Sequence, residues 1–330
     1  MKKIPSTIDN QIFKEDVLEV LYNRYSVIGP IWTKQQMEWA NGIYQTFKDH
    51  DKFLLIVYII KNTLDFYSHN FVKLSYDEFY SHDTVEIRKF NTIDLSNALN
   101  IPKESTRRKI IELQKAGAIK KDTKKFIIDR SAFPLIKPIK STVRIARFLA
   151  VFSNLLVEEN ILPKPFKSEN IEKILKKNFS YIWKIYYEMQ IPMLLSWKKV
   201  FKDLETWHIW AVCAVNQHLA YSTKERKENH IEKNRDDFLN ELLYSDNLIN
   251  SHGINAMSLS DITGIPRATV IRKLNNLIKL NHLKIDSKKH YRLTGKNSGQ
   301  KFQIQKDTIT QLANFSTIIY NLMVVSEKEL

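Results

Sequence analysis

The sequence contains few residues that would cross-link or interrupt a chain. Among its 330 residues are one cysteine, seven glycines and nine prolines. A single cysteine excludes a disulfide within the chain, which suits a reducing compartment. Cys213 lies in the apolar run 209–215, so we interpret it as a core residue and not as a nucleophile. The scarcity of glycine and proline predicts long helices joined by short loops, with little disorder.

Long hydrophobic runs are also missing. The longest are residues 53–60 and the run 148–152, which has further apolar residues at 155–157. Both are far shorter than the roughly 20 residues that span a bilayer. The first residues lead into polar sequence and lack the apolar stretch of a signal peptide. We therefore expect a soluble, cytoplasmic protein without a membrane partner.

Signatures of catalysis and metal binding are absent as well. The sequence has no glycine-rich phosphate loop, no paired-cysteine spacing for zinc and no His-Glu-x-x-His motif. Its nine histidines are scattered. His208 and His218 fall on one apolar segment, but ten residues separate them, too far for one metal. We interpret them as structural, and we predict neither an enzyme nor a cofactor.

The charge balance favours a polyanionic partner. There are 51 lysines and arginines against 36 aspartates and glutamates, which gives a formal net charge of +15. Such an excess attracts nucleic acid or, less often, an anionic membrane surface. The alternative is a lysine-rich solvated surface without a specific partner.

An internal repeat dominates the sequence. Residues 95–125 match residues 259–289 without a gap, with twelve identities in 31 positions. Among the identical pairs are Ser96/Ser260, Pro102/Pro266, Arg108/Arg272, Lys109/Lys273 and Leu113/Leu277. Unrelated helical segments would not match so well, so the repeat predicts a gene duplication.

The match extends along most of the chain. At an offset of 154, residues 47–49 align with 201–203, and Glu15, Leu21 and Ser26 have identical counterparts. The change of offset implies an insertion between Tyr221 and Leu259. Residues 159–165 hold two prolines and suit a linker. We predict two units, 1–160 and 161–330, with pseudo-twofold symmetry.

Each unit begins with amphipathic helices, followed by an almost wholly apolar helix at 53–66 or 207–219. A closing helix is expected at about 142–157 and 307–324. A stripe of aromatic residues in the second unit could line a ligand pocket, but we interpret it as core. Its members are Phe201, Trp207, Trp210 and Tyr221.

The copied segment reads as a DNA-binding element. In the second copy, 258–263 is a short helix with a serine start signal, Gly264 permits a sharp turn, and Pro266 precedes a helix at 267–278. A strand at 283–285, a basic turn at 286–289 and a return strand at 290–293 follow. Helix, turn, helix and basic hairpin predict a winged helix-turn-helix at about 92–130 and again at about 256–295. The fold class predicted is mainly α, with these two units embedded in helical bundles.

Residues 259–274 resemble the DNA-binding element of IclR-type and MarR-type bacterial transcription regulators, and 291–294 resembles the end of their wing. The resemblance covers about 40 residues in each copy and implies binding of double-stranded DNA and transcriptional control. The chain departs from these families because it has no room for an IclR effector domain, has a short wing and carries both copies. We therefore expect either a monomer whose two units act like the subunits of a dimer (a pseudo-dimer) or a homodimer. The resemblance leaves the operator and any small-molecule effector open.

Helical geometry selects the residues that would face DNA. At 100° per residue, Val270, Leu274 and Leu277 point to the core, and the opposite face carries arginine and asparagine, which suit guanine and adenine edges. The recognition face of the first copy also carries glutamates, so this copy is less suited to DNA. We expect it either to read a different DNA sequence or to serve mainly in packing. The predicted DNA-binding residues are Ser105, Arg107, Arg108, Glu112, Lys121, Lys124 and Lys125, with Arg267, Ala268, Thr269, Arg272, Asn275, Asn276, Lys288 and Lys289.

Three functions remain open on this basis. The first is a sequence-specific transcription regulator. The second is a plasmid-type or phage-type replication initiator with tandem winged helices. The third is a protein-interaction scaffold that uses winged-helix surfaces without DNA.

Overall fold

Helices make up most of the chain, which confirms the prediction of a mainly α protein. The computed structural model describes residues 11–81, 83–87, 90–122, 125–129, 131, 139–227, 232–244 and 253–327. Within these ranges, no helix combines the length and the apolarity that a membrane span requires.

The first half of the chain runs from three long helices through a helix pair and a small sheet to a closing helix. In chain order its elements are α1 (Lys14–Asn23), α2 (Tyr25–Phe47), α3 (His50–His69), α4 (Tyr76–Phe79), β1 (Thr84–Ile87), α5 (Thr92–Leu99), α6 (Lys103–Lys115), β2 (Ile119–Asp122), β3 (Lys125–Asp129) and α7 (Ile139–Glu158).

The second half has a similar order, with a longer closing helix. Its elements are α8 (Ser168–Lys177), α9 (Phe179–Phe201), α10 (Leu204–Lys227), α11 (Arg235–Tyr244), α13 (Ala256–Thr263), α14 (Arg267–Lys279), β4 (Leu283–Ile285), β5 (Tyr291–Leu293) and α15 (Ser298–Glu327).

Four pairs of corresponding helices have equal lengths. Helices α1 and α8 have 10 residues each, and α2 and α9 have 23, with bounds 154 residues apart. Helices α5 and α13 have 8 residues, and α6 and α14 have 13, with bounds 164 residues apart. These are the two offsets at which the sequence matches itself.

Side-chain caps fix where several helices begin. The Asp49 carboxylate accepts hydrogen bonds from backbone N–H groups in the first turn of α3, satisfying donors that have no partner within the helix. In the second half the α13 cap is Asn255, whose side-chain oxygen accepts from the Ser258 backbone N–H. The predicted serine start signal was therefore wrong, because Ser258 already lies inside the helix and donates to the cap.

Left-handed residues make the turns that separate the paired helices. Gly264 ends α13 with φ +70°, which confirms its predicted role, and Asn100 ends α5 with φ +48°. Pro102 and Pro266 immediately precede α6 and α14, where a missing N–H costs nothing. Three residues thus join the paired helices in both halves.

The two hairpins differ in size. Strands β4 and β5 pair with Leu283 opposite Leu293, close to the predicted hairpin. In the first half β3 lies between β1 and β2, giving a three-stranded antiparallel sheet. The sequence analysis did not predict β1. Its counterpart in the second half is a single bridge between Ile254 and Tyr291.

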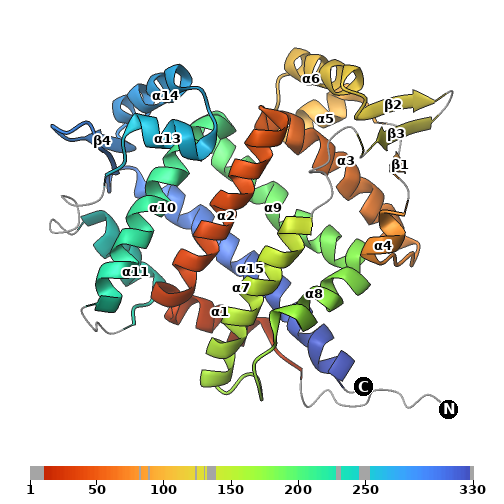
Figure 1. Cartoon of the computed structure of the whole chain (residues 1–330), viewed down its shortest axis with the longest axis horizontal. Coiled ribbons are helices and arrows are strands. Elements are labelled where there is room, and N and C mark those ends of the chain that lie inside the picture. The colour runs from red at the N-terminus through yellow and green to blue at the C-terminus, as the bar shows by residue number, and fades with distance from the viewer. Residues whose placement is uncertain are drawn as a thin grey trace.

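The helices of the two halves are packed into each other. Helix α2 of the first half lies along α10 of the second, and α3 lies along α9. Helix α15 packs on both α1 and α9, while α7 packs on α8 across the predicted boundary at residue 160. Buried apolar side chains from both halves form one continuous core. Figure 1 shows these long helices in the middle of the molecule, with a helix pair and hairpin at each upper corner.

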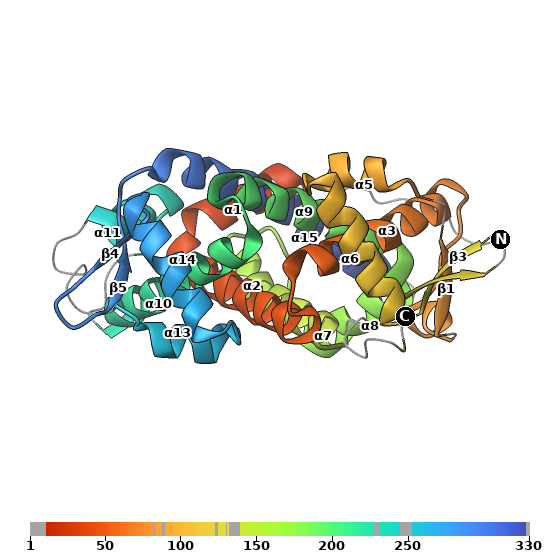
Figure 2. The same cartoon turned by 90° about the horizontal axis from the view of Figure 1, so that it is seen from above.

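Both helix pairs occupy the same side of the molecule. Seen from above, α14 with α13 lies at one end and α6 with α5 at the other, and the long helices lie between and beneath them (Figure 2). The arrangement leaves α6 and α14 uncovered on a common face.

Candidate nucleic-acid interface

Helix α14 has one buried and one exposed face. Val270, Leu274 and Leu277 are completely buried, which confirms the predicted core face. The predicted reading residues of this helix lie on its other side. Arg267, Ala268, Arg272, Asn275 and Asn276 are exposed, and Thr269 is partly exposed.

An ion pair attaches α14 to the long helix beneath it. Lys273 Nζ lies 2.6 Å from Asp203 Oδ2, and the lysine side chain is only 11% exposed. The same carboxylate accepts from the Thr206 backbone N–H and so caps α10. One aspartate therefore both begins the supporting helix and holds the helix above it.

The first half contains the same device. Lys109 of α6 pairs with Asp49, which caps α3. Lys109 and Lys273 are identical across the repeat, as are Asp49 and Asp203. The sequence therefore held the signal for these anchors, although the pairing of lysine with aspartate was not predicted.

Arg272 lies on the exposed face without an ionic partner. Among the described residues, no carboxylate lies within ion-pair distance of its guanidinium. Its neighbour Ile271 is 38% exposed, and Ile262 on α13 is also exposed. These isoleucines were not predicted as site residues, and they offer apolar contact beside the arginine of the kind that a thymine methyl accepts.

The corresponding face of α6 is partly neutralised by its own carboxylates. Arg108 is 68% exposed, and its Nε lies 3.8 Å from Glu112 Oε1. Arg107 Nε lies 3.0 Å from Glu104 Oε2. Ser105 is partly exposed, at the position equivalent to Thr269.

Glu112 is also bound to the scaffold. Its Oε2 lies 2.6 Å from Lys52 Nζ of α3, and the lysine hydrogen bond lowers the pKa of this carboxyl below its ordinary value. A charged carboxylate held in this way is not available to a DNA base without breaking the pair. The prediction that Glu112 contacts DNA remains untested, but its position favours a structural role.

The hairpin of the second half presents two lysines at its tip. Lys288 and Lys289 are exposed, and Lys289 has φ +59°. Asp286 shapes this turn by accepting from the backbone N–H groups of Lys288 and His290. These bonds and the nearby Arg292 lower the pKa of Asp286, the His290 bond contributing most.

The lysines of the first hairpin can be placed only in part. Lys120 pairs with Asp129 at 2.5 Å, and this bond, aided by Ser131, lowers the pKa of Asp129 to about 2. Lys121 lies in β2 and Lys125 in β3, but their side chains are outside the description, and Lys124 lies outside the described residues altogether.

Cys213, His208 and His218 are all buried. Cys213 is a core residue, as predicted, and burial raises the pKa of its thiol to about 12. His208 Nε2 lies 2.7 Å from Asn41 Oδ1, and His218 Nδ1 lies 3.1 Å from Thr33 Oγ1. In the described part of the chain, no three or more His, Cys, Asp or Glu side chains are grouped as a metal site would require.

In comparisons with known proteins, no family model matches the chain, and neither a curated protein nor a solved structure matches it significantly.

Proposed function

We propose that the chain is a sequence-specific double-stranded DNA-binding protein, a transcription regulator with two winged helix-turn-helix units on one polypeptide. The observation that carries the proposal is the outward face of α14. There Arg272, Asn275 and Asn276 are exposed on a helix whose base is fixed by Lys273 and Asp203. Arginine and asparagine make paired hydrogen bonds to guanine and adenine edges in the major groove.

A duplication with pseudo-twofold symmetry would place two recognition helices on one chain, in keeping with this proposal. Equal lengths in four pairs of helices, an offset that is constant within each segment and a repeated Lys–Asp anchor are the expected marks of two copies of one unit. Regulators with one such unit per chain must dimerise to present two recognition helices. Here α6 and α14 lie on one face of a single chain (Figure 2).

The two units contribute unequally under this proposal. Glu104 and Glu112 of α6 pair with cations, whereas α14 has no acidic residue between its bounds. Carboxylates near the sugar–phosphate backbone repel it, so α14 makes the principal base contacts. Helix α6 reads a second, different half-site or holds the scaffold in place.

Selection of bound sites from random and genomic duplexes tests the proposal. The most enriched duplex and a scrambled duplex are then compared by fluorescence anisotropy at several salt concentrations. We expect at least about a thousandfold preference for the selected site and a steep loss of affinity with salt. Weak binding that ignores sequence and salt would contradict the proposal and favour a protein-interaction scaffold. Enrichment of iterated origin-like repeats would indicate a replication initiator.

A further inference from the structure

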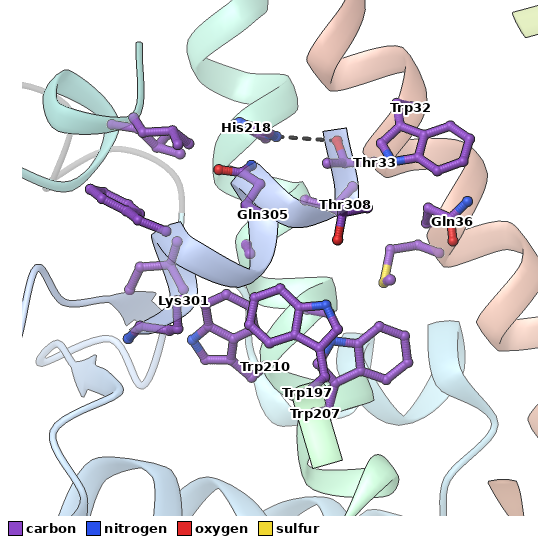
Figure 3. Close-up of a pocket in the computed structure, with 18 of the residues that line it drawn as sticks. Trp32, Thr33, Gln36, Trp197, Trp207, Trp210, His218, Lys301, Gln305 and Thr308 are labelled. Carbon is purple, nitrogen blue, oxygen red and sulfur yellow. Dashed lines mark hydrogen bonds between the residues drawn. The ribbon is translucent and has the colours of Figure 1, made fainter. Parts of the chain in front are cut away.

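A cavity of about 140 Å³ lies beside the second hairpin, between helices of both halves (Figure 3). Its walls come from α2, α9, α10, α11 and α15, with Leu293 and Thr294 at the end of β5. Its position away from the outward face of α14 separates it from the proposed DNA contacts. A buried apolar cavity of about 150 Å³ is large enough to hold a benzene ring.

Tryptophan dominates the walls. Four of the six tryptophans of the chain line this cavity, namely Trp32, Trp197, Trp207 and Trp210. Figure 3 shows Trp197, Trp207 and Trp210 grouped together, with Trp32 and Gln36 on another side. The lining residues include no aspartate or glutamate. Flat aromatic walls favour a flat aromatic occupant, because ring faces and edges attract one another.

Small residues of α10 open the cavity at positions where the first half has larger ones. Ala211 and Ala214 line it, and the residues 154 positions earlier are Val57 and Ile60. His218, also in the lining, corresponds to a leucine. At these three positions the second copy has less apolar volume than the first and has gained one polar ring.

The His218 ring has one nitrogen, Nε2, without a hydrogen-bond partner among the described residues. The Thr33 hydroxyl lies 3.0 and 3.1 Å from the carbonyl oxygens of Gly29 and Pro30, and 3.1 Å from His218 Nδ1. When its single hydrogen is directed to one of these carbonyls, the hydroxyl oxygen accepts from His218 Nδ1–H. Burial lowers the pKa of His218 to about 3, which keeps the ring neutral. In that tautomer Nε2 is an acceptor, and it has no hydrogen-bond partner in the structure. A buried acceptor without a donor is costly, and a ligand N–H or O–H removes that cost.

Lys301 argues against a charged ligand. Its side chain is 5% exposed and lines the cavity beside the Trp210 ring, but its Nζ hydrogen-bonds the Lys296 carbonyl and His282 Nδ1. Burial lowers its pKa to about 8. A cation would be repelled by Lys301, and it would find no carboxylate among the lining residues. An anion would have to give up its hydration for the one Lys301 donor that the Lys296 carbonyl and His282 leave free.

We propose that this cavity is a binding site for a small, uncharged aromatic molecule that carries one N–H or O–H donor. The rings of the ligand pack against the tryptophans, and its donor bonds His218 Nε2. The small wall residues of the cavity, Ala211 and Ala214, and its polar ring, His218, come from α10 of the second half. The site does not depend on the proposed DNA binding, because no residue of α14 lines the cavity.

Calorimetric titration with indole tests the class of ligand. Benzofuran has nearly the same shape but no N–H donor, and we expect it to bind about tenfold more weakly because His218 Nε2 stays without a donor. Benzoate and benzylamine, which carry opposite charges, should bind more weakly than indole. Absence of indole binding, equal affinity for benzofuran, or tighter binding of either charged probe would overturn the proposal.

Variants of the wall locate the site. Ala214→Ile and Ala211→Val install the first-half residues and should each weaken indole binding more than tenfold, without loss of thermal stability. Ala220→Ile on the same helix, outside the lining, is the matched control. His218→Leu should bring indole and benzofuran to equal affinity. Should Ala214→Ile fail to fold, the smaller Ala211→Val still decides. Unchanged indole affinity in the folded wall variants would refute the location.

Discussion

Arg272 and Arg108 occupy equivalent positions but have different surroundings. Arg272 has no carboxylate partner among the described residues, whereas Arg108 lies 3.8 Å from Glu112, which Lys52 also binds. A guanidinium that must break an ion pair before it contacts a DNA base contributes less to the free energy of binding. The same residue type at repeated positions therefore has unequal capacity to read DNA.

Replacing Arg272 with alanine should abolish most of the preference at one base pair. A bidentate arginine–guanine contact discriminates against other bases by roughly ten- to hundredfold, and its loss leaves phosphate contacts intact. The measurement is binding to a library of single-base operator variants. Arg147→Ala on α7, also an exposed arginine, is the control. A uniform weakening across the library would contradict a base-reading role.

Buried histidines make the fold sensitive to acid. Burial lowers the pKa of His50 and of His218 to about 3, from an ordinary value of 6.5. Above pH 6.5 both the folded and the unfolded rings are neutral, so their contribution to stability is complete. Below pH 6.5 these rings bind protons in the unfolded state but not in the folded state. The free energy of unfolding therefore falls by up to about 1.4 kcal/mol per pH unit for each ring.

We therefore expect the free energy of unfolding to decrease steadily from pH 6.5 to pH 4. Urea unfolding across that range measures it, and His50→Leu should flatten the dependence. A stability that stays constant over this interval would show that these rings are solvated.

At the scale of elements, the Lys–Asp anchors fix each exposed helix to the N-terminus of a scaffold helix. In a Lys273→Met variant the stem is kept and the charge is lost. We expect a loss of about 1 kcal/mol, a modest value because Asp203 is 43% exposed to solvent. Chemical denaturation measures this change. The free energy of DNA binding should change by more than the free energy of unfolding, since α14 loses its fixed orientation. Lys279→Met, at the exposed end of the same helix, is the comparison.

The turn between α13 and α14 requires a residue that tolerates positive φ. A Cβ at position 264 would meet only Gln45 Cγ at 3.8 Å, so Gly264→Ala creates no clash and only strains the backbone. We expect a loss of about 1 kcal/mol in unfolding free energy. Gly42→Ala, inside α2 with nothing within 4 Å, should instead stabilise the protein by a similar amount. Equal effects of the two substitutions would argue against the left-handed turn.

At the scale of the whole molecule, the net charge of +15 predicts salt-sensitive binding to any duplex. Lys288 and Lys289 extend from the second hairpin and are placed to meet phosphates. Changing both to glutamine should weaken selected and scrambled duplexes alike and lower the log–log salt slope by about 0.9 for each lost contact. Affinity measured against salt tests this. A loss confined to the selected duplex would show that the lysines read bases.

Much of the fold could be predicted from the sequence because local rules act within each repeat. The spacing of Val270, Leu274 and Leu277 identified the buried face of α14, and Gly264 identified the turn before it. Strand β1 escaped prediction because its pairing with β3 joins residues about 40 positions apart, and four residues carry little periodic signal. The start of α13 was misplaced because Asn255 and Ser258 are both good caps.

The helix pairs, the hairpins and the two offsets at which the chain matches itself could be predicted from the sequence alone. These features depend on residues a few positions apart or on direct comparison of the two copies. The packing of α2 on α10 and of α3 on α9 could be seen only in the folded chain. The tertiary structure also gave Glu112 a partner in Lys52 and made Trp207 and Trp210 walls of a cavity and not only parts of the core. Such outcomes depend on which surfaces meet across the two halves, and periodicity within one helix does not specify its distant neighbour.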